Sequence, residues 1–401
     1  MPDPDPPIHR LEEQPPVNDV VLPLEGVRVV EVAQVLAAPY VASLLGDLGA
    51  DVVKVERPEG DLIRPTDALL RAGGSAYFAS ANRNKRYLTV DLKDPVDRRR
   101  LNREIAECDV LVTNGRPGAV HRAGLDYEAV RALRPDVVYC LVTAFGESGP
   151  RCEEPGMDLT AQALAGLMGT TGEPDGPPAK TSSPVGDYSA ALFAVQGVLA
   201  ALYRRTRTGQ GAKVGVNLLD ASLAMLGNYV PQVSVTGVDL ARVGSGHQQL
   251  VPYQAFPDAH GEYFVVACLT QKFWELLCTA IDRPEWRRDT RFLTNTDRRN
   301  HRALLVGELT ALFATRPRAE WIALLGARGV PTCEVNSLTQ ALEDPQVRHN
   351  GIVVQTPPDD VHGVYRFIGN PLLLDDERLP VRSTAQPLAP LPRSALQTGA
   401  G

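Results

Sequence analysis

Between residues 27 and 145, short β-branched runs alternate with amphipathic segments. The first two runs are VRVVEVA at 27–33 and DVVKVER at 51–57, and each predicts a strand. Between them, the segment from Pro39 to Gly49 places apolar residues at i, i+3, i+4 and i+7, which predicts a helix. A strand, a helix and a strand in this order indicate a βαβ unit with parallel strands and a right-handed crossover.

The same alternation continues after the second run. The further elements that we expect are strands at 87–92, 109–113 and 137–145 and helices at 96–108 and 127–133. This order of elements predicts a doubly wound α/β domain on a mostly parallel sheet. Ligands of such sheets bind beyond the carboxyl ends of the strands, so the loops at those ends are the first candidates for a binding site.

A long apolar helix, PVGDYSAALFAVQGVLAALYRR, is predicted at 187–205, after a shorter helix at 158–168 and a loop rich in glycine and proline. Only two uncharged polar residues follow Asp187 before the basic end, so the helix is apolar on nearly every side and should be buried. A carboxylate at the first position of such a helix has two interpretations. Asp187 is either an ordinary helix cap or a carboxylate that a substrate can reach.

The alternation of single strands and helices ends after this helix. Residues 253–268 have the pattern of a β-hairpin with its turn at Pro257 to Gly261. The helices that we expect next are at 271–281, 296–314 and 318–327, the last with Thr315 as its N-cap. This region predicts a smaller α+β domain, and only short strand-like runs follow at 352–382.

Length and composition narrow the class of protein. A chain of 401 residues exceeds what one compact core usually holds, so two domains are expected. The apolar runs are too short and interrupted to predict a membrane span, and the first residues lack the apolar segment of a signal peptide. We therefore expect a cytoplasmic protein that does not bind membranes. The net charge of -7 gives no support to nucleic-acid binding.

The residues that usually hold metals or disulfides show no such spacing. The six cysteines form no CxxC pair, and the seven histidines form no HExxH motif, so we expect no metal site. The cysteines are expected to be buried, reduced thiols, at positions 108, 140, 152, 268, 278 and 333.

Common nucleotide and hydrolase motifs are also absent. The first predicted strand is followed by AQVLAAP rather than GxGxxG, which argues against a nicotinamide-dependent dehydrogenase. Neither GxxxxGK[ST] nor GxSxG occurs, so a P-loop and an α/β-hydrolase nucleophile are not predicted. The glycine-rich RVGSGHQ at 242–248 lies outside the βαβ context and alone is more typical of a flexible turn.

Eight segments, in order from about Pro23 to Pro371, form the most specific pattern in the chain. They are PLEGVRVVEVAQVLAAPYVASLLGDLGADVVKVERPEGD, NRNKRYLTVDLK, DVLVTNGRPGAVHRAGLDYEAVRALRPDVVYC, FGESGP, GMDLTAQALAG, TGEPDGPP, PVGDYSAALFAVQGVLAALYRRTRTGQGAKV and GVPTCEVNSLTQALEDPQV. Together they resemble the class III CoA-transferases, the CaiB/BaiF family.

This resemblance implies a fold with two domains and an unusual dimer. A Rossmann-like large domain would comprise 23–225 and 335–385, and a small α+β domain with its linkers would be inserted at 226–334. Residues 1–22 and 386–401 would be flexible tails. Two subunits would interlock as rings in a homodimer. The terminal QPLAPLPRSALQTGAG departs from the family pattern, so the closure of the large domain by its C-terminal end is open.

The resemblance also implies that Asp187 is the catalytic nucleophile. Its carboxylate would attack an acyl-CoA thioester to give a mixed anhydride, and the released CoA thiolate would return to give an aspartyl-CoA thioester. Asp187 would have to stay ionised near pH 7, which a helix N-terminus favours by roughly 0.3–1 kcal/mol. Gly186, which has no side chain, would leave room for the thioester. The substrates would be an acyl-CoA donor and a carboxylic acid acceptor, with no permanently bound cofactor.

Coenzyme A carries phosphates and an adenine, so its site needs cations and a flat platform. Arginine suits both tasks because its planar fork binds phosphate and stacks on a base. Lys85 is a weaker candidate for the same site. The positions that match CoA contacts of the family are Leu36, Ala37, Arg57, Val90, Lys93, Asn114, Arg116 and Arg122.

Two further features bear on the substrate. The residues Gly244, Ser245, Gly246 and His247 partly match a mobile loop that closes over the reacting acyl group in relatives. Leu36 stands where relatives that act on formyl and oxalyl groups have glutamine, which argues against oxalate and formate and towards a larger acyl group.

Three alternatives to a CoA-transferase remain to be weighed. An acyl-CoA racemase of the same superfamily uses a histidine where this chain has Met157, and a thioether cannot act as a proton base. A catalytically silent CoA-binding protein is disfavoured by the presence of Asp187. A dehydrogenase is disfavoured by the missing glycine fingerprint.

Overall fold

The larger part of the molecule is built on one six-stranded sheet. The structure is a computed structural model and describes residues 21–67, 69–70, 74–356 and 364–388, so almost all of the two expected tails lies outside the described residues. The strands are β1 (Arg28–Val32), β2 (Asp51–Glu56), β3 (Lys85–Thr89), β4 (Val110–Asn114), β5 (Val138–Thr143) and β6 (Ala212–Asn217).

All neighbouring strands of this sheet are parallel, in the order β3-β2-β1-β4-β5-β6. This is the strand order of a Rossmann-like fold, and the predicted parallel α/β sheet is confirmed. The sequence does not predict the strand β6. Its sequence AKVGVN is no apolar run, because β6 lies at an edge of the sheet and is only partly buried.

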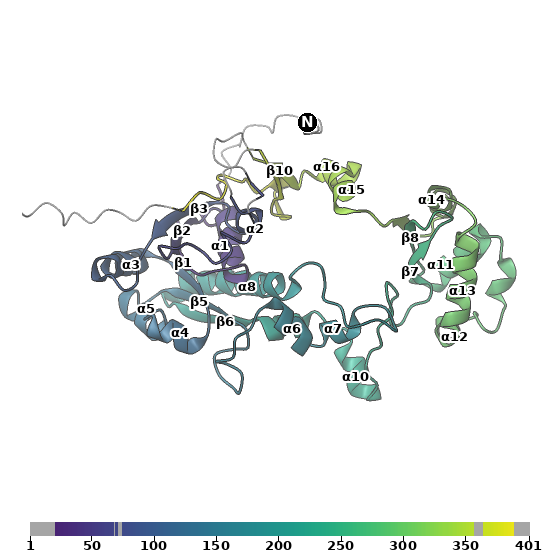
Figure 1. Ribbon diagram of the computed structural model, residues 1–401, viewed down its shortest axis with the longest axis horizontal. Coiled ribbons are helices and arrows are strands. Elements are labelled where there is room, and N and C mark those ends of the chain that lie inside the picture. The colour runs from purple at the N-terminus through teal and green to yellow at the C-terminus, as the bar shows by residue number, and fades with distance from the viewer. Residues whose placement is uncertain (1–20, 68, 71–73, 357–363, 389–401) are drawn as a thin grey trace, which may run out of the picture.

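Helices cover both faces of the sheet (Figure 1). Buried side chains alternate along the four central strands β1, β2, β4 and β5, so each of these contributes to two separate cores. The first core lies against α1 (Ala37–Asp47), α8 (Val185–Thr208) and α9 (Leu218–Ala224). The second core lies against α3 (Pro95–Glu107), α4 (Pro117–Arg122) and α5 (Tyr127–Leu133).

Four short helices lie outside these two layers. Gly166, in the left-handed conformation with φ 86°, splits the helix expected at 158–168 into two. Glycine adopts this conformation without the cost that a Cβ would add. The four helices are α2 (Ala76–Ser80), α6 (Asp158–Leu164), α7 (Leu167–Thr170) and α10 (Val230–Thr236).

A second group of elements has its own core, centred on Trp274, Phe313 and Trp321. The predicted hairpin is present as β7 and β8, and β9 joins it on the other side of β8. The elements of this group are β7 (Tyr253–Pro257), β8 (Tyr263–Ala267), β9 (Thr332–Glu334), α11 (Gln271–Ala280), the 3-10 helix at Pro284–Arg287, α12 (Asn295–Asn300), α13 (Arg302–Phe313) and α14 (Arg318–Gly326).

Two predictions for this group are wrong in detail. The helix expected at 296–314 is broken at His301, which closes α12 and opens α13 with a non-helical ψ of 26°. Thr315 does not cap the next helix, because α14 begins only at Arg318 and Pro317 is its N-cap residue.

The chain passes twice between the sheet and the second group. Figure 1 shows one passage through α10 and a return through α15 and α16. The return leads to two small hairpins, in agreement with the expected short strands. The elements of the return are α15 (Leu338–Glu343), α16 (Pro345–Asn350), β10 (Val353–Gln355), β11 (Arg366–Ile368), β12 (Leu373–Leu374) and β13 (Glu377–Arg378).

The described C-terminal segment at 379–388 contains no helix and binds residues beside the large sheet. The guanidinium group of Arg382 donates to the carbonyl oxygens of Gly46 and Ala50, at 2.6 and 3.0 Å. The backbone N–H groups of Arg382 and Ser383 both donate to Oδ1 of Asn84, at 2.7 and 3.0 Å. These bonds join the segment just before the atypical end to the N-terminal part of the large sheet, while residues 389–401 lie outside the described residues.

The long helix α8 is not buried on every side, which corrects the expectation from its composition. It contacts α1, α9, β5 and β6, but a stripe of large apolar side chains on it is exposed, with Leu192 60% and Tyr203 65% accessible. By length and apolar composition it is also the one described helix that could span a membrane, so the expectation that no run is long enough is wrong. Core helices of soluble proteins meet the same criterion.

The cysteines agree only in part with the expectation of buried thiols. All six are free. Four of them are buried, whereas Cys152 is half-buried and Cys333 is exposed.

Candidate active site

Asp187 lies in the first turn of α8, at the carboxyl edge of the sheet. Because α8 runs back to the start of the parallel strand β6, its N-terminus lies at the edge where ligands of such sheets bind. The helix begins at Val185 and Pro184 is its N-cap residue, so Asp187 is the third helical residue. The interpretation of Asp187 as an ordinary cap is therefore wrong.

Gly186 is needed for close packing of helices. A Cβ at this position would lie 2.7 Å from Oγ of Ser222 on α9 and 3.0 Å from Oδ1 of Asp158 on α6. The N–H of Gly186 donates to that same Asp158 oxygen at 2.8 Å, and Gln162 donates to the other oxygen at 2.7 Å. The space beside Gly186 is thus filled by α6 and α9, rather than left open for a thioester as expected.

The environment of Asp187 opposes its negative charge. Its side chain is only 9% exposed, and none of the described residues donates a hydrogen bond to its carboxylate. Burial, followed by the nearby charge of Asp158, raises the pKa of Asp187 to about 7. Burial thus opposes the ionised carboxylate that the transfer requires near pH 7, although Asp187 lies at a helix N-terminus.

Tyr77 and Tyr188 lie close enough to this carboxylate for its charge to raise their pKa values, and Tyr40 packs against Tyr188; the sequence predicts none of the three at the site. The rings of Tyr40 on α1 and Tyr188 on α8 meet edge to face at 5.0 Å. Burial raises the pKa of Tyr77, on α2, to about 12, and the charge of Asp187 is the next cause. Tyr77 therefore lies close enough to Asp187 to feel its charge. No local motif marks these residues, because α1, α2 and α8 meet only in the folded chain.

The predicted CoA positions near β1 and β4 lie on neighbouring loops. Leu36 and Ala37 directly precede and open α1, and both side chains are buried, so a ligand could reach only their backbone. Asn114 ends β4 and pairs with the backbone of Gln34, accepting from its N–H at 3.0 Å and donating to its carbonyl at 2.8 Å. Val90, at the end of β3, is also buried.

The predicted cationic residues remain accessible at the same edge of the sheet. Arg57 follows β2 and donates through Nε to the carbonyl oxygen of Gly60 at 2.9 Å. Arg116 is the exposed N-cap residue of α4, and Arg122 is the exposed last residue of that helix. Lys93, in the turn before α3, is exposed as well.

Lys85 is wrong as a phosphate ligand. Its side chain is fully buried, and Nζ donates to the carbonyl oxygens of Pro39 and Ala81 and to Oδ1 of Asn82. The same nitrogen lies 2.7 Å from a carboxylate oxygen of Glu31. Burial lowers the pKa of Lys85 to about 7.

The glycine loop lies against the glycine- and proline-rich loop that leads to α8. The N–H of Gly244 donates to the carbonyl oxygen of Gly172 at 2.9 Å, and Oγ of Ser245 accepts from the N–H of Ala255 in β7. The ring Nδ1 of His247 accepts backbone hydrogen bonds, and burial lowers the pKa of this histidine. The loop therefore links the second group of elements to the segment before Asp187.

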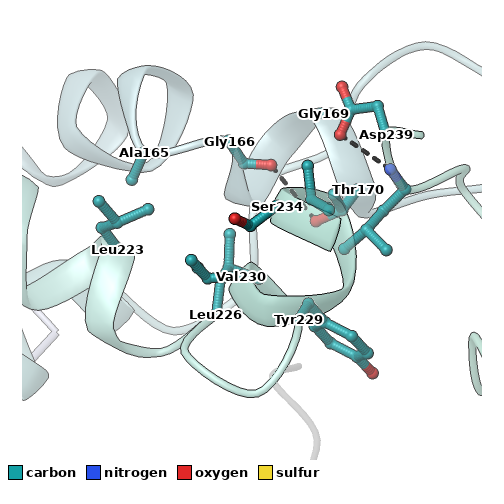
Figure 2. A pocket seen from close by; sticks show the side chains of 12 residues that line it. Ala165, Gly166, Gly169, Thr170, Leu223, Leu226, Tyr229, Val230, Ser234 and Asp239 are labelled. Atoms are coloured by element: carbon teal, nitrogen blue, oxygen red, sulfur yellow. Dashed lines mark hydrogen bonds between the residues drawn. The ribbon is translucent and has the colours of Figure 1, made fainter. Parts of the chain in front are cut away.

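A cavity of about 380 Å³ lies between α7, α10 and the end of α9 (Figure 2). Its lining is largely apolar, with Leu223, Leu226 and Val230 on one side. None of the residues predicted to bind CoA lines it. No group of three or more His, Cys, Asp or Glu side chains within the described ranges could hold a metal ion.

The strand order and the site together define a Rossmann-like α/β protein with a buried carboxylate beside loops that carry exposed arginines. Residues 24–389 match the family model described as CoA-transferase family III. The chain therefore belongs to family III of the CoA-transferases. This finding confirms the resemblance of its motifs, and the protein is a CoA-transferase.

Individual relatives and solved structures agree with this family. The chain is 37% identical to succinyl-CoA:glutarate CoA-transferase of Mus musculus, over 84% of this chain and 77% of the relative. It is 34% identical to succinyl-CoA:mesaconate CoA-transferase of Haloarcula hispanica, over 94% and 96%. The crystal structure of a CaiB/BaiF family protein from Brucella suis superposes with a TM-score of 0.81 at 35% identity, covering 92% of this chain and 96% of that one.

Proposed function

We propose that this protein moves CoA from a dicarboxylic acyl-CoA, such as succinyl-CoA, to a second dicarboxylic acid, with Asp187 as nucleophile. The observation that carries the proposal is the Asp187 carboxylate, which is buried in the first turn of α8 at the ligand edge of the sheet and accepts no hydrogen bond from any residue that the structure describes. A carboxylate without such partners keeps its lone pairs free for attack. The dicarboxylic substrates are inferred from the names of the relatives.

Each step of the proposed transfer balances without a net proton. The Asp187 oxygen attacks the thioester carbon, the C–S bond breaks, and CoA thiolate leaves a mixed anhydride behind. The thiolate then attacks the Asp187 carbonyl carbon, which frees the donor acid and forms an aspartyl-CoA thioester. The acceptor carboxylate attacks the carbonyl carbon of this thioester, the C–S bond breaks, and CoA thiolate leaves a second mixed anhydride. The thiolate finally attacks the acceptor carbonyl of this anhydride, which forms the new acyl-CoA and frees the Asp187 carboxylate.

The proposed CoA site uses the loops beyond β1, β2, β3 and β4. Arg57, Arg116 and Arg122 would bind the phosphates and the adenine, since a guanidinium group pairs with phosphate and stacks on a base. Lys93 would add charge. The backbone of Leu36, Ala37 and Val90 and the side chain of Asn114 would line the pantetheine chain, because the apolar side chains themselves are buried. CoA enters and leaves as a substrate, and no permanent cofactor or metal takes part.

The loop Gly244–His247 is proposed to cover the acyl group during transfer. It rests on the segment that leads to Asp187, so a movement of this loop would act on the approach to the nucleophile. Racemisation is not proposed, because Met157 is 60% exposed at the start of α6 and offers no proton base.

A homodimer of interlocked rings is proposed as the working unit, in the cytoplasm and away from membranes. The large domain would comprise 23–225 and 335–385, and the small domain with its linkers 226–334. The exposed apolar side chains of α6, α8 and α9 support a partner surface, because monomeric proteins rarely expose a large contiguous apolar patch. They are Leu159, Leu164, Leu192, Phe193, Tyr203 and Leu223.

The test measures CoA products by mass spectrometry. Purified protein is incubated with succinyl-CoA and glutarate, mesaconate or oxalate, and each new acyl-CoA is quantified. We expect products from the larger dicarboxylates, and we expect Asp187→Ala to lower transfer by about 10³-fold or more, as loss of a nucleophile does. The matched control is Glu128→Gln, an exposed carboxylate on α5, which should transfer at the wild-type rate.

Three results would contradict this proposal. Transfer by Asp187→Ala at more than a tenth of the wild-type rate would remove Asp187 from the chemistry. Deuterium exchange at the α-carbon of acyl-CoA without any acceptor would favour a racemase. Hydroxylamine added with acyl-CoA should also leave a modified Asp187 peptide, and an unmodified peptide would exclude the covalent route.

A further inference from the structure

The backbone of the first loop after β1 holds a conformation that its residue disfavours. Val35 has a φ of 71°, in the left-handed region. A β-branched side chain clashes with its own backbone there, at a cost that glycine would not bear. Val35 lies between the end of β1 and Leu36, the N-cap residue of α1. A conformation of this kind persists only where the surroundings hold it.

The buried carboxylate of Asp61 holds Val35 in this conformation. The N–H of Val35 donates to Oδ1 of Asp61 at 3.0 Å, and the N–H of Ile63 donates to the same oxygen at 3.1 Å. Asp61 is 2% exposed and comes from the loop after β2, so two loops of the ligand edge are joined through one side chain. The N–H of Asp61 in turn donates to Oε1 of Glu56 at 2.9 Å.

A buried lysine fixes the other oxygen of this carboxylate. Nζ of Lys54, on β2, donates to Oδ2 of Asp61 at 2.9 Å, to Oε1 of Glu31 at 2.7 Å and to the carbonyl oxygen of Ala33 at 3.0 Å. Its three protons therefore have three acceptors, two of them charged. Ala33 directly follows β1. Lys54 therefore binds the first residue of this loop, and Asp61 binds Val35, two residues further on.

The loop is also held from its other side, at the end of β4. Asn114 at the end of β4 makes two hydrogen bonds to the backbone of Gln34. Asp61 and Asp187 both act on the pKa of Tyr77, after burial as its main cause, so the carboxylate that holds Val35 lies near the reacting centre. Residues 33–36 are thus clamped between β2 and β4.

We propose that Asp61 and Lys54 are positioning residues for the acyl-CoA substrate. They hold Val35 in its left-handed conformation, and by this they set the path of the backbone at Leu36 and Ala37 that receives the thioester-bearing arm of CoA. The inference rests on the proposed contact between this loop and CoA. It assigns no chemical step to either residue, and it predicts an effect on binding of acyl-CoA rather than on turnover.

The test compares Asp61→Asn with the double variant Asp61→Asn/Val35→Gly. An amide has only one oxygen, so the side chain in Asp61→Asn could not accept hydrogen bonds from both Val35 and Lys54. Asp61→Asn should therefore raise the KM for acyl-CoA about tenfold, as loss of one buried hydrogen bond does. The kcat should stay within about twofold of wild type. Glycine adopts a positive φ freely, so adding Val35→Gly should recover most of this loss. Titration calorimetry with free CoA should give the same order of dissociation constants.

The matched control is Asp47→Asn, which breaks a second buried ion pair. Asp47 binds Arg83 at 2.6 Å, at the opposite end of α1 from the loop. This variant should lower the thermal midpoint but leave the KM for acyl-CoA unchanged. A chain with Asp61→Asn that fails to fold should regain its fold with Val35→Gly, because the strained residue is gone.

Three outcomes would overturn the proposal. They are an unchanged KM in folded Asp61→Asn, equal KM defects in the single and the double variant, and a double variant that stays unfolded. Calorimetry separates this inference from the proposed chemistry, since CoA binding can be measured even if no tested acid accepts CoA. Loss of transfer with the predicted binding pattern would contradict the proposed substrates alone.

Discussion

At the scale of single residues, the burial of Asp187 decides how the site responds to pH. A raised pKa means that the folded chain binds a proton that the unfolded chain has already released between about pH 4 and pH 7. The stability that this proton contributes is complete below the unfolded value of 3.8 and is lost as the pH rises through about 7. Ionisation of Asp187, which forms the nucleophile, therefore lowers the stability of the folded chain, as is common for buried reactive groups.

The first prediction concerns the pH profile of transfer. Only the ionised carboxylate attacks, so kcat/KM for acyl-CoA should fall with decreasing pH below an apparent pKa of about 7. Asp158→Asn removes the charge that adds to the effect of burial, so the acid limb should move to lower pH. Steady-state rates from about pH 5 to about pH 9 locate the acid limb in wild type and in Asp158→Asn.

A control for this profile is the unfolding free energy of Asp187→Asn. The amide has no charge to desolvate, so this variant should gain stability over wild type above pH 7 by up to about 4 kcal/mol, at about 1.4 kcal/mol per pKa unit. The difference should shrink towards pH 4. An acid limb that stays in place in Asp158→Asn would remove Asp158 as a cause of the raised pKa. An Asp187→Asn variant with no pH-dependent gain in stability would show that Asp187 does not titrate near 7.

At the scale of elements, the start of α8 depends on contact with two other helices. Gly186 is the point at which α8 approaches α6 and α9, and Asp158 binds its N–H. The apolar composition of α8 predicts burial, but only the packed helices show which side is buried. The exposed stripe on α8 has the same apolar character as its buried face.

The second prediction compares two glycines in helices. Gly186→Ala would place a Cβ 2.7 Å from Ser222 Oγ and 3.0 Å from Asp158, so it should destabilise the fold by about 1–3 kcal/mol through overpacking and lower transfer by displacing Asp187. Gly307 in α13 has nothing within 4 Å of a Cβ, so Gly307→Ala should stabilise by about 0.5–1 kcal/mol. Chemical denaturation and transfer assays compare the two variants.

The opposite ranking would be decisive. A Gly186→Ala protein as stable as Gly307→Ala would mean that α6 and α9 yield easily at this point. Full activity in Gly186→Ala would further mean that the close approach of α8 does not place the nucleophile.

At the scale of the whole molecule, the exposed apolar surface on α6, α8 and α9 needs a partner to cover it. The chain passes twice between its two groups of elements, which is the arrangement that interlocked rings require (Figure 1). The C-terminal segment completes this path by binding Gly46, Ala50 and Asn84 on the large sheet. A second copy of the chain is the partner that we propose.

The third prediction tests this partner. Leu192→Asp together with Phe193→Asp places two charges on the exposed stripe of α8, where a partner would have to desolvate them. Sedimentation velocity should show a homodimer for wild type and a monomer for the double variant. The control is Val96→Asp, at an exposed site of α3 on the other face of the sheet, which should remain dimeric. A wild-type monomer would contradict the proposed assembly.

Much of the fold could be predicted from the sequence because its causes are local. The apolar runs of β1, β2, β4 and β5 and the apolar spacing of α1, α5 and α11 arise from burial of consecutive segments, and their periodicity is visible in one dimension. The edge strand β6 was not predicted, because an edge strand is half-exposed and its residues need not be apolar. The break at His301 was not predicted either, because neither glycine nor proline marks it in NTDRRNHRALL.

The sequence by itself determined the parallel α/β class, the family and the candidate nucleophile, because ordered motifs and hydrophobic periods survive without any tertiary contact. Only the tertiary structure decided that Asp187 has a pKa of about 7, that Lys85 is buried against Glu31, and that Asp61 reaches Val35. Desolvation and hydrogen bonding depend on which residues meet across distant parts of the chain. Such meetings follow from packing, and local sequence carries no record of them.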